Sequence, residues 1–423
     1  MIGTPSCVDN VLHVRERLSL PFNGLIDIYC AFGVSRESDL VDNTRFLFGC
    51  DQLWDVLLSK LNRTLSIIPS KIPTISTVPS RHHYSTAIVD YSLFHSSIKK
   101  FSCSPEVSIT IIIMSTTRNI LVVGATGQQG GAVVRALASP RVPSGDPPIN
   151  ILALTRNPDS PKAKSLLESH KDDDVLLSLV KGDSSNPASI FDSRPSGSVH
   201  GVFIVTTPGK ISEESQAIPL IDAAINHGVR RIVFSSVDRR GDQESWDNPC
   251  PEIKHFHSKH KIELHLRDKA SQEGVSWAVL RPTAFLENFS PGFFGSMFTA
   301  IWHSALSPER KLQLVSVRDI GIFAAKALTE DEQKWSGRAV GLAGDELTLD
   351  EAREVFKRVT GKKLPQTYTI LARLLMWMVP DMGNMFRWFE TQGYGVDIAE
   401  RRKEVPEMLD FEGWLKQSNW MNQ

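Results

Sequence analysis

The stretch that most constrains the fold is residues 120–137, because its hydrophobic period changes in the middle. An apolar run of strand length meets a cluster of glycines, and apolar residues then return at helical spacing. This order predicts a strand, a tight turn and a helix. Gly124 allows the sharp exit from the strand, Gly127 lets backbone N–H groups approach a ligand, and Gly130 lets the helix pack closely on the sheet.

Such a turn suits an anion, since the N–H groups at a helix N-terminus lack partners and the helix dipole is positive there. We therefore predict that it holds the pyrophosphate of a dinucleotide; the alternative is a turn without a ligand. The residues assigned to this cradle are Gly124, Thr126, Gly127, Gln128, Gln129 and Gly130.

From Asn119 onward, strand-length apolar runs alternate with helical patterns. This alternation predicts an α/β fold with a doubly wound parallel sheet of the Rossmann type, which we assign to residues 115–283. Further strands are predicted at 149–155, 176–180, 201–206, 231–235 and 277–280, and helices at 213–227 and 252–273.

The pattern loosens in residues 284–423, which are predicted to form a smaller, mainly helical subdomain for a substrate or a partner. A returning strand and helix are expected near 312–328, and a capping box at Thr348 and Glu351 opens a helix that Gly361 ends. Residues 368–388 are dense in Leu, Met and Trp. We interpret them as helices packed in the core, with a small-molecule pocket or a partner surface as the alternative.

Residues 1–114 show no sustained period and are predicted to be a poorly ordered N-terminal extension; an organellar transit segment is the alternative. The net charge of −1 favours neither nucleic acid nor a membrane as a direct partner, and the apolar run 109–114 is too short to cross a bilayer. Charged residues near the start argue against a secretory signal. The five cysteines are widely spaced, which indicates neither a zinc site nor a disulfide framework. We expect a cytoplasmic protein, or one shared with the nucleus.

Ligands of open parallel sheets bind outside the C-terminal ends of the strands. The second predicted strand ends at Arg156, with Lys162 nearby, and not at the Asp or Glu that would hold a ribose 2′-hydroxyl. A guanidinium binds phosphate oxygens in pairs, which favours NADP over NAD, although Arg156 could also be a solvated surface residue. The positions assigned to the rest of the cofactor are Asp183 and Ser184 after the third strand and Thr206 and Thr207 after the fourth.

Short-chain reductases on this kind of sheet pair a tyrosine with a lysine four residues later, and the lysine holds the ribose while the tyrosine moves the substrate proton. Lys259 is available here, but the tyrosine position holds His255, and no YxxxK occurs in the chain. Histidine can move protons near neutral pH, so His255 is the second catalytic candidate. Ser235 lies where a substrate-orienting serine would be. The neighbouring histidines lack cysteine or well-spaced carboxylate partners, so no metal site is predicted.

Together these features resemble the NmrA-like family of atypical short-chain dehydrogenase/reductases, from about Asn119 to the C-terminus. The motifs are GATGQQGG at 124–131, TRNP at 155–158, KGD at 181–183, HFxxK at 255–259 and RPTAFLENF at 281–289. The resemblance implies NADP on a Rossmann domain and a smaller domain over the cleft. It also implies that Lys259 contacts the nicotinamide ribose and that Phe285 and Asn288 border the nicotinamide or the substrate. The loop 139–148 and the N-terminal extension depart from the family pattern.

Two functions stay open on the sequence. The first is an NADP(H)-dependent oxidoreductase of the NmrA type that transfers hydride to a small molecule, with Lys259 as ribose anchor and candidate proton donor. The second is a redox-sensing transcriptional co-regulator that binds NADP and a protein partner with little or no turnover. The missing tyrosine favours the sensor, whereas the retained lysine favours the enzyme.

Overall fold

The structure is a computed structural model that describes residues 117–139, 149–171 and 175–422, together with five strands nearer the N-terminus. The chain divides into two compact units, residues 1–116 and 117–423. The strands of the first unit are β1 (Ser6–Val8), β2 (Val11–Ser19) and β3 (Leu25–Gly33), which form one antiparallel sheet, and the antiparallel pair β4 (Lys100–Ser104) and β5 (Val107–Thr110). The rest of this unit lies outside the described residues, so the poorly ordered extension stays a prediction.

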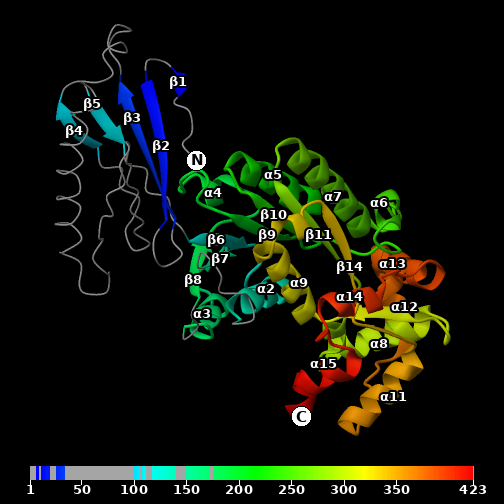
Figure 1. Cartoon of the computed structure of the whole chain (residues 1–423). Helices are drawn as coiled ribbons and strands as arrows, with labels where there is room; N and C mark the ends of the chain where they lie inside the picture. The colour runs from blue at the N-terminus through cyan, green and yellow to red at the C-terminus, as the bar shows by residue number, and fades with distance from the viewer. Residues whose placement is uncertain are drawn as a thin grey trace. The chain divides into compact units, whose positions relative to one another are not determined.

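The second unit is built on a parallel sheet of seven strands (Figure 1). They are β6 (Arg118–Val122), β7 (Ile149–Thr155), β8 (Leu176–Lys181), β9 (Gly201–Val205), β10 (Arg231–Ser235), β11 (Ser276–Pro282) and β14 (Arg338–Leu342). Their order is β14-β11-β10-β9-β6-β7-β8, so the chain runs outward from β6 in one direction and then from β9 in the other. The predicted doubly wound Rossmann sheet is confirmed, and its topological switch point lies between β6 and β9.

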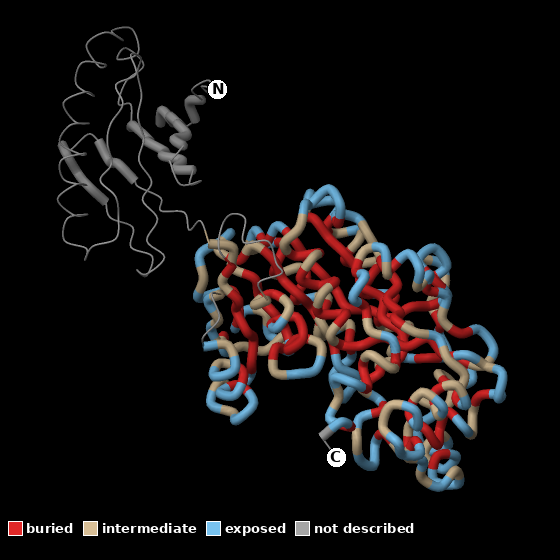
Figure 2. Tube along the Cα trace, turned by 60° about the horizontal axis from the view of Figure 1, so that its bottom comes forward, coloured by how far each residue is buried: buried red, intermediate tan, exposed pale blue. Residues whose placement is uncertain are grey.

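Two pairs of long helices cover the sheet, one pair on each face (Figure 1). On one face lie α2 (Gln128–Ala138) and α9 (Val317–Thr329), and on the other α5 (Glu213–Asn226) and α7 (Lys254–Gln272). Successive strand side chains point to opposite faces, so Ile120 and Val122 pack under the first pair while Leu121 and Val123 pack under the second. The strands are apolar almost throughout because both faces are buried, as the continuous red band in Figure 2 shows.

Shorter helices lie in the connections between the strands: α3 (Pro161–Glu168), α4 (Ala188–Phe191), α6 (Glu244–Asp247) and α10 (Glu332–Trp335). The returning segment predicted near 312–328 is β13 (Leu312–Val315) followed by α9. A Cβ at Gly321 of α9 would lie 2.5 Å from the carbonyl oxygen of Ala132, so glycine is what lets α9 pack directly on α2. The chain then enters β14, the seventh strand, which the sequence analysis did not predict.

The remaining C-terminal residues form a mainly helical region around a small sheet of β12 (Ala284–Phe285), β13 and β15 (Asp345–Leu347). Its helices are η2 (Leu286–Phe289), α8 (Phe293–Ala305), α11 (Leu349–Thr360), α12 (Thr369–Met378), α13 (Pro380–Thr391), α14 (Ile398–Glu404), α15 (Phe411–Gln417) and η3 (Asn419–Asn422). The capping box of Thr348 and Glu351 is present, and Gly361 ends α11 with a φ of 72°. No helix among the described residues has the length and apolar character needed to cross a membrane.

The interpretation of residues 368–388 as core helices is right for one helix and wrong for the other. In α13, Phe386, Trp388 and Phe389 are buried, but in α12 only Ala372 is. The sequence could not separate them, because both segments carry large apolar residues at helical spacing and only the tertiary packing decides which face is covered.

Candidate functional site

The predicted cofactor positions are gathered at one edge of the sheet. Because β6 to β11 are parallel, the residues that follow their C-terminal ends meet along the same edge. The glycine turn faces the end of β9: a Cβ at Gly124 would lie 3.0 Å from Cγ1 of Val205. The structure therefore brings the glycine turn together with the residues that follow β9 and β10.

The glycine turn has the geometry that the sequence predicts. Gly124 has a φ of 66°, in the left-handed region, and its carbonyl accepts a 2.8 Å hydrogen bond from the N–H of Gly127. A Cβ at Gly130 would lie 2.2 Å from that same carbonyl oxygen, closer than any real side chain could be placed. The first turn of α2 is thus folded directly against the turn, and only glycine fits at position 130.

The N-terminus of α2 is open to an anion. Gly127 is its N-cap and supplies no side-chain hydrogen bond, and the first turn carries no acidic residue. The side-chain amide of Gln129 is fixed in position, because its Oε1 accepts a 2.6 Å hydrogen bond from the buried hydroxyl of Ser235. Thr126 is half-buried and Gln128 exposed at the same turn. Free N–H groups at the positive end of a helix form a site for a phosphate group.

The residues after β7 and β8 lie on the surface. Arg156 and Lys162 are exposed, and within the described part of the chain neither makes a hydrogen bond or ion pair. The side chain of Asp183 accepts a hydrogen bond from the N–H of Ser185 and so holds the turn after β8, with Ser184 half-buried inside that turn. An exposed guanidinium at the end of β7 is available to an anion without breaking an internal contact.

A buried polar cluster lies at the end of β9, and it contains the predicted lysine. The Nζ of Lys259, on α7, donates to the hydroxyl of Thr206 at 3.0 Å and lies 2.9 Å from Oε2 of Glu213. Thr206 also donates to the same carboxylate oxygen. All three residues are at least nine-tenths buried. Thr207, the next residue, is exposed, and its backbone is held by the side chain of Gln216.

Glu213 is the functional residue that sequence reasoning missed. The sequence marks it only as the start of a predicted helix, and no motif connects it with Lys259, 46 positions away (259 − 213). Its other oxygen, Oε1, is buried without a hydrogen-bond partner among the described residues. An acidic residue at the start of the helix that follows the fourth predicted strand is the one sequence signal that could have pointed to it, and its burial is known only from the structure.

His255, the second catalytic candidate, is bound elsewhere. Its Nδ1 lies 2.5 Å from Oδ2 of Asp381 on α13, and the other carboxylate oxygen accepts a hydrogen bond from the N–H of Lys254. Ile253, the N-cap of α7, offers no side-chain cap, so Asp381 takes over that function. His255 thereby connects the C-terminal region to α7, and this is a positioning contact.

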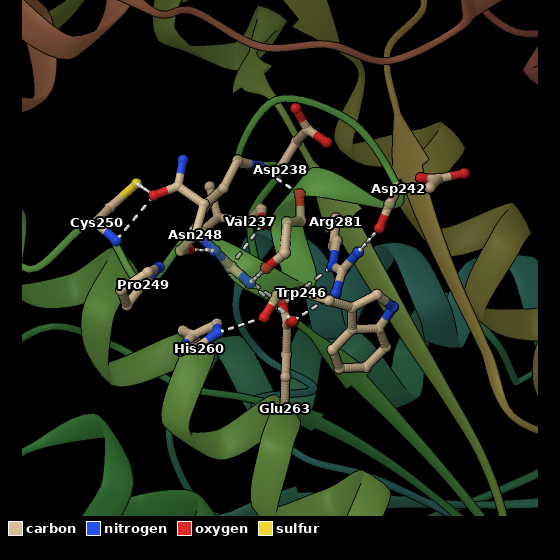
Figure 3. Close-up of polar contacts among 12 residues, drawn as sticks. Val237, Asp238, Asp242, Trp246, Asn248, Pro249, Cys250, His260, Glu263 and Arg281 are labelled. Carbon is tan, nitrogen blue, oxygen red and sulfur yellow. Dashed lines mark hydrogen bonds and ion pairs between the residues drawn. The ribbon is translucent and has the colours of Figure 1, made fainter.

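A buried ionic network centred on Glu263 lies one turn farther along α7 than Lys259 (Figure 3). Glu263 binds the guanidinium of Arg239 at 2.8 Å and that of Arg281 at 2.7 Å, and none of the three side chains is exposed. Burial by itself raises the pKa of Glu263, but the two guanidiniums outweigh it and the pKa lies below its usual value. Since Arg281 belongs to β11 and Arg239 follows β10, the network fixes the rotation of α7 and hence the direction of Lys259.

The far side of the edge is lined by the end of β11. Phe285 is half-buried and Asn288, in η2, is exposed. Burial raises the pKa of the Cys250 thiol to about 12. Within the described part of the chain, no group of three or more His, Cys, Asp or Glu side chains is arranged to hold a metal ion.

The fold and the site define a Rossmann-type α/β protein with a glycine cradle for an anion and a buried, paired lysine at the same sheet edge. The chain belongs to the NmrA-like family, whose sequence profile matches residues 116–415. An NmrA-like family domain-containing protein of Dictyostelium discoideum is 25% identical over 319 residues, which are 72% of this chain and 99% of the relative. The NmrA-like oxidoreductase hkm9 of Aspergillus hancockii is 29% identical over 268 residues, 59% of this chain and 74% of hkm9.

Solved structures share the fold at low sequence identity. The triphenylmethane reductase of Citrobacter sp., in complex with NADP(H), has a TM-score of 0.51 and 20% identity and covers 71% of this chain and 99% of its own. The negative transcriptional regulator NmrA, in complex with NAD, has a TM-score of 0.52 and 17% identity and covers 72% of this chain and 99% of its own. An enzyme and a regulator therefore share this architecture.

Proposed function

We propose that this chain is an NADP(H)-dependent oxidoreductase that acts on a small molecule. The observation that carries the proposal is the pairing of Lys259 with Glu213 and Thr206, at the sheet edge where the glycine cradle opens. Burying an ammonium and a carboxylate at this position stabilises the fold less than packing apolar side chains there would. The presence of the pair therefore favours a functional reason for it. Sites that carry such groups at strand ends are candidates for chemistry.

A nicotinamide dinucleotide fits the residues present. The glycine at position 130 lets the first turn of α2 lie directly against the glycine turn, and that first turn has no competing carboxylate. When bound, the cofactor would supply or accept a hydride. The residues that would hold it are Gly124, Thr126, Gly127, Gln128, Gln129 and Gly130 at the pyrophosphate, Arg156 and Lys162 at the 2′-phosphate, Asp183 and Ser184 at the adenine side, and Thr206, Thr207, Ser235, Lys259, Phe285 and Asn288 toward the nicotinamide.

The residues of the chain have distinct tasks in this proposal. Lys259 directs two of its three N–H donors to Thr206 and Glu213, which leaves one for the ribose or for the reacting atom of the substrate. Glu213 and Thr206 orient that ammonium group, and Ser235 steadies the cradle through Gln129. His255 stays a weaker catalytic candidate because Asp381 holds its Nδ1.

The preference for NADP over NAD rests on Arg156. The exposed guanidinium has no internal partner in the described residues, which leaves it available to a 2′-phosphate. Proteins of this fold differ in the dinucleotide with which they were solved: the Citrobacter reductase with NADP(H) and the NmrA regulator with NAD.

Turnover of NADPH tests the proposal. Quinones and triphenylmethane dyes are suitable probes, because fold neighbours are an NADPH-dependent quinone oxidoreductase of Escherichia coli and a triphenylmethane reductase. We expect NADPH consumption that Lys259→Ala abolishes. Lys261→Ala is the matched control, since Lys261 lies on the same helix, is half exposed and pairs 3.7 Å from Glu214. Activity unchanged in Lys259→Ala would refute the assigned role of this lysine.

The second candidate function is a redox sensor that binds the cofactor and a protein partner with little turnover. The sequestered His255 and the absence of a YxxxK tyrosine favour it. Tight NADP(H) binding with no oxidation of NADPH by any probe would select the sensor over the enzyme.

A further inference from the structure

A concentration of exposed, large apolar side chains in the C-terminal region has no task in the proposed reaction. Of the twelve large apolar side chains that are exposed among the described residues, nine lie on α12, its flanks and the start of α8. We call them the outer apolar surface: Phe293, Phe294, Tyr368, Ile370, Leu371, Leu374, Trp377, Met378 and Val379. Surfaces of this kind on a folded domain mark contact sites, because leaving them in water is unfavourable.

The residues of the outer apolar surface share one side of the structure. At 100° per residue, Ile370, Leu374 and Trp377 lie on one face of α12, while Ala372, the one buried residue of this helix, lies opposite. The start of α8 lies beside the segment that leads into α12, because the N–H of Thr367 donates to the carbonyl of Ser296 at 3.1 Å. The aromatic tips are well exposed, with Phe294 at 87% and Trp377 at 78%.

The charges around this surface are mostly positive. Residues 361–391, which include α12 and α13, contain four cationic side chains, Lys362, Lys363, Arg373 and Arg387, and two carboxylates, Asp381 and Glu390. The carboxylate of Asp381 is occupied by His255 and by the N–H of Lys254 on α7, and that of Glu390 accepts a hydrogen bond from the N–H of Ser307. The net charge of −1 for the whole chain conceals this local excess of positive charge.

We propose that the outer apolar surface docks on an anionic membrane surface, with α12 lying in the plane of the lipid headgroups. Exposed Trp, Phe and Leu side chains beside Lys and Arg are the combination that binds such an interface, through apolar burial and attraction to anionic lipid. A second copy of the chain fits less well, because a symmetric contact would bring the same positive rim against itself. This proposal is independent of the proposed function, since it uses none of the cofactor-edge residues.

Vesicle sedimentation tests the proposal with the full-length chain. We expect binding to vesicles of phosphatidylcholine with about one-third phosphatidylserine, weak binding to pure phosphatidylcholine, and loss of binding at high salt. The double variant Phe294→Ala, Trp377→Ala should bind about tenfold more weakly or worse, and Arg373→Glu should weaken binding to anionic vesicles alone. The matched control is Ile211→Ala, an exposed apolar residue outside this surface at 50% exposure.

Two results would overturn the docking proposal. One is that the wild-type chain does not bind the anionic vesicles, or that the double variant binds them as strongly as the wild type, with circular dichroism showing that both chains are folded. The other is self-association, seen as a concentration-dependent mass in sedimentation equilibrium that the double variant loses while vesicles bind neither chain. The second result would assign the surface to a second copy.

Discussion

Substitutions at Glu213 and Lys259 test whether these two buried side chains stabilise the fold as a coupled ion pair or independently of each other. Both groups are nearly inaccessible, with side-chain exposures of 3% and 11%, and their charged atoms are 2.9 Å apart. Glu213→Gln keeps the shape but leaves the ammonium without a counter-charge, which costs about 3 kcal/mol of unfolding free energy. Lys259→Met keeps the aliphatic stem and leaves the carboxylate unpaired, at a similar cost of about 3 kcal/mol.

The double variant leaves no charge unpaired, so it should lose only about 1 to 2 kcal/mol and not the ~6 kcal/mol sum of the two single losses, which is a coupling of about 4 to 5 kcal/mol. The assay is urea unfolding followed by tryptophan fluorescence for the wild type and the three variants. The half-exposed pair of Lys269 and Glu273, 3.1 Å apart, is the control and should couple by about 0.5 kcal/mol or less. Additive losses at Glu213 and Lys259 would refute the ion-pair account of this site.

The remaining predictions concern the cradle, the cofactor phosphate and pH. Gly130→Ala should displace the glycine turn and weaken NADP(H) binding by tenfold or more, because its Cβ would lie 2.2 Å from a backbone oxygen of the turn; calorimetric titration measures this once circular dichroism has shown the variant to be folded, and unchanged affinity in the folded variant would remove the cradle from the site. Arg156→Ala should weaken NADP by about 1 to 3 kcal/mol and leave NAD unaffected, and an equal loss for both dinucleotides would contradict the assignment of the 2′-phosphate. Burial, the largest cause, raises the pKa of Asp319 from its ordinary 3.8 to about 6. Between these values the folded chain binds more protons than the unfolded chain, so the stability held below pH 4 falls as the pH rises to 6, by up to about 3 kcal/mol. Asp319→Asn should lack this loss in denaturation curves measured from pH 4 to 7, and parallel curves for the two proteins would show that burial of this carboxyl has no such effect.

Local patterns predicted the elements of the sheet because they depend on residues close together in the chain. Residues 120–137 give strand, turn and helix as expected, and α7 lies at 254–272 against the predicted 252–273. The strand β14 escaped prediction, since its five residues have no strong pattern and become a strand only by pairing with β11, about 60 positions earlier. The exposure of α12 could not be predicted for the same kind of reason, because the apolar pattern of a helix does not indicate whether another element covers its apolar face.

The residues of the candidate site also differ in whether the sequence alone could identify them. The glycine turn and Lys259 could be named from the sequence, because each belongs to a short motif whose spacing has a direct geometric meaning. Glu213 could not, because its importance comes from α5 and α7 lying side by side on one face of the sheet. His255 carried a catalytic hypothesis in the sequence, and only the structure revealed that Asp381 on α13 holds its ring.

By itself, then, the sequence determined the Rossmann-type sheet and the strand, glycine turn and helix at 120–137, and it singled out Lys259, since hydrophobic periodicity and glycine spacing depend only on residues close together in the chain. The tertiary structure alone decided which carboxylate faces that lysine, which buried arginines orient its helix and which apolar helix stays in contact with water. Those features depend on side chains dozens of positions apart, and burial changes the energy of a charge or an apolar group far more than its neighbours in the sequence do.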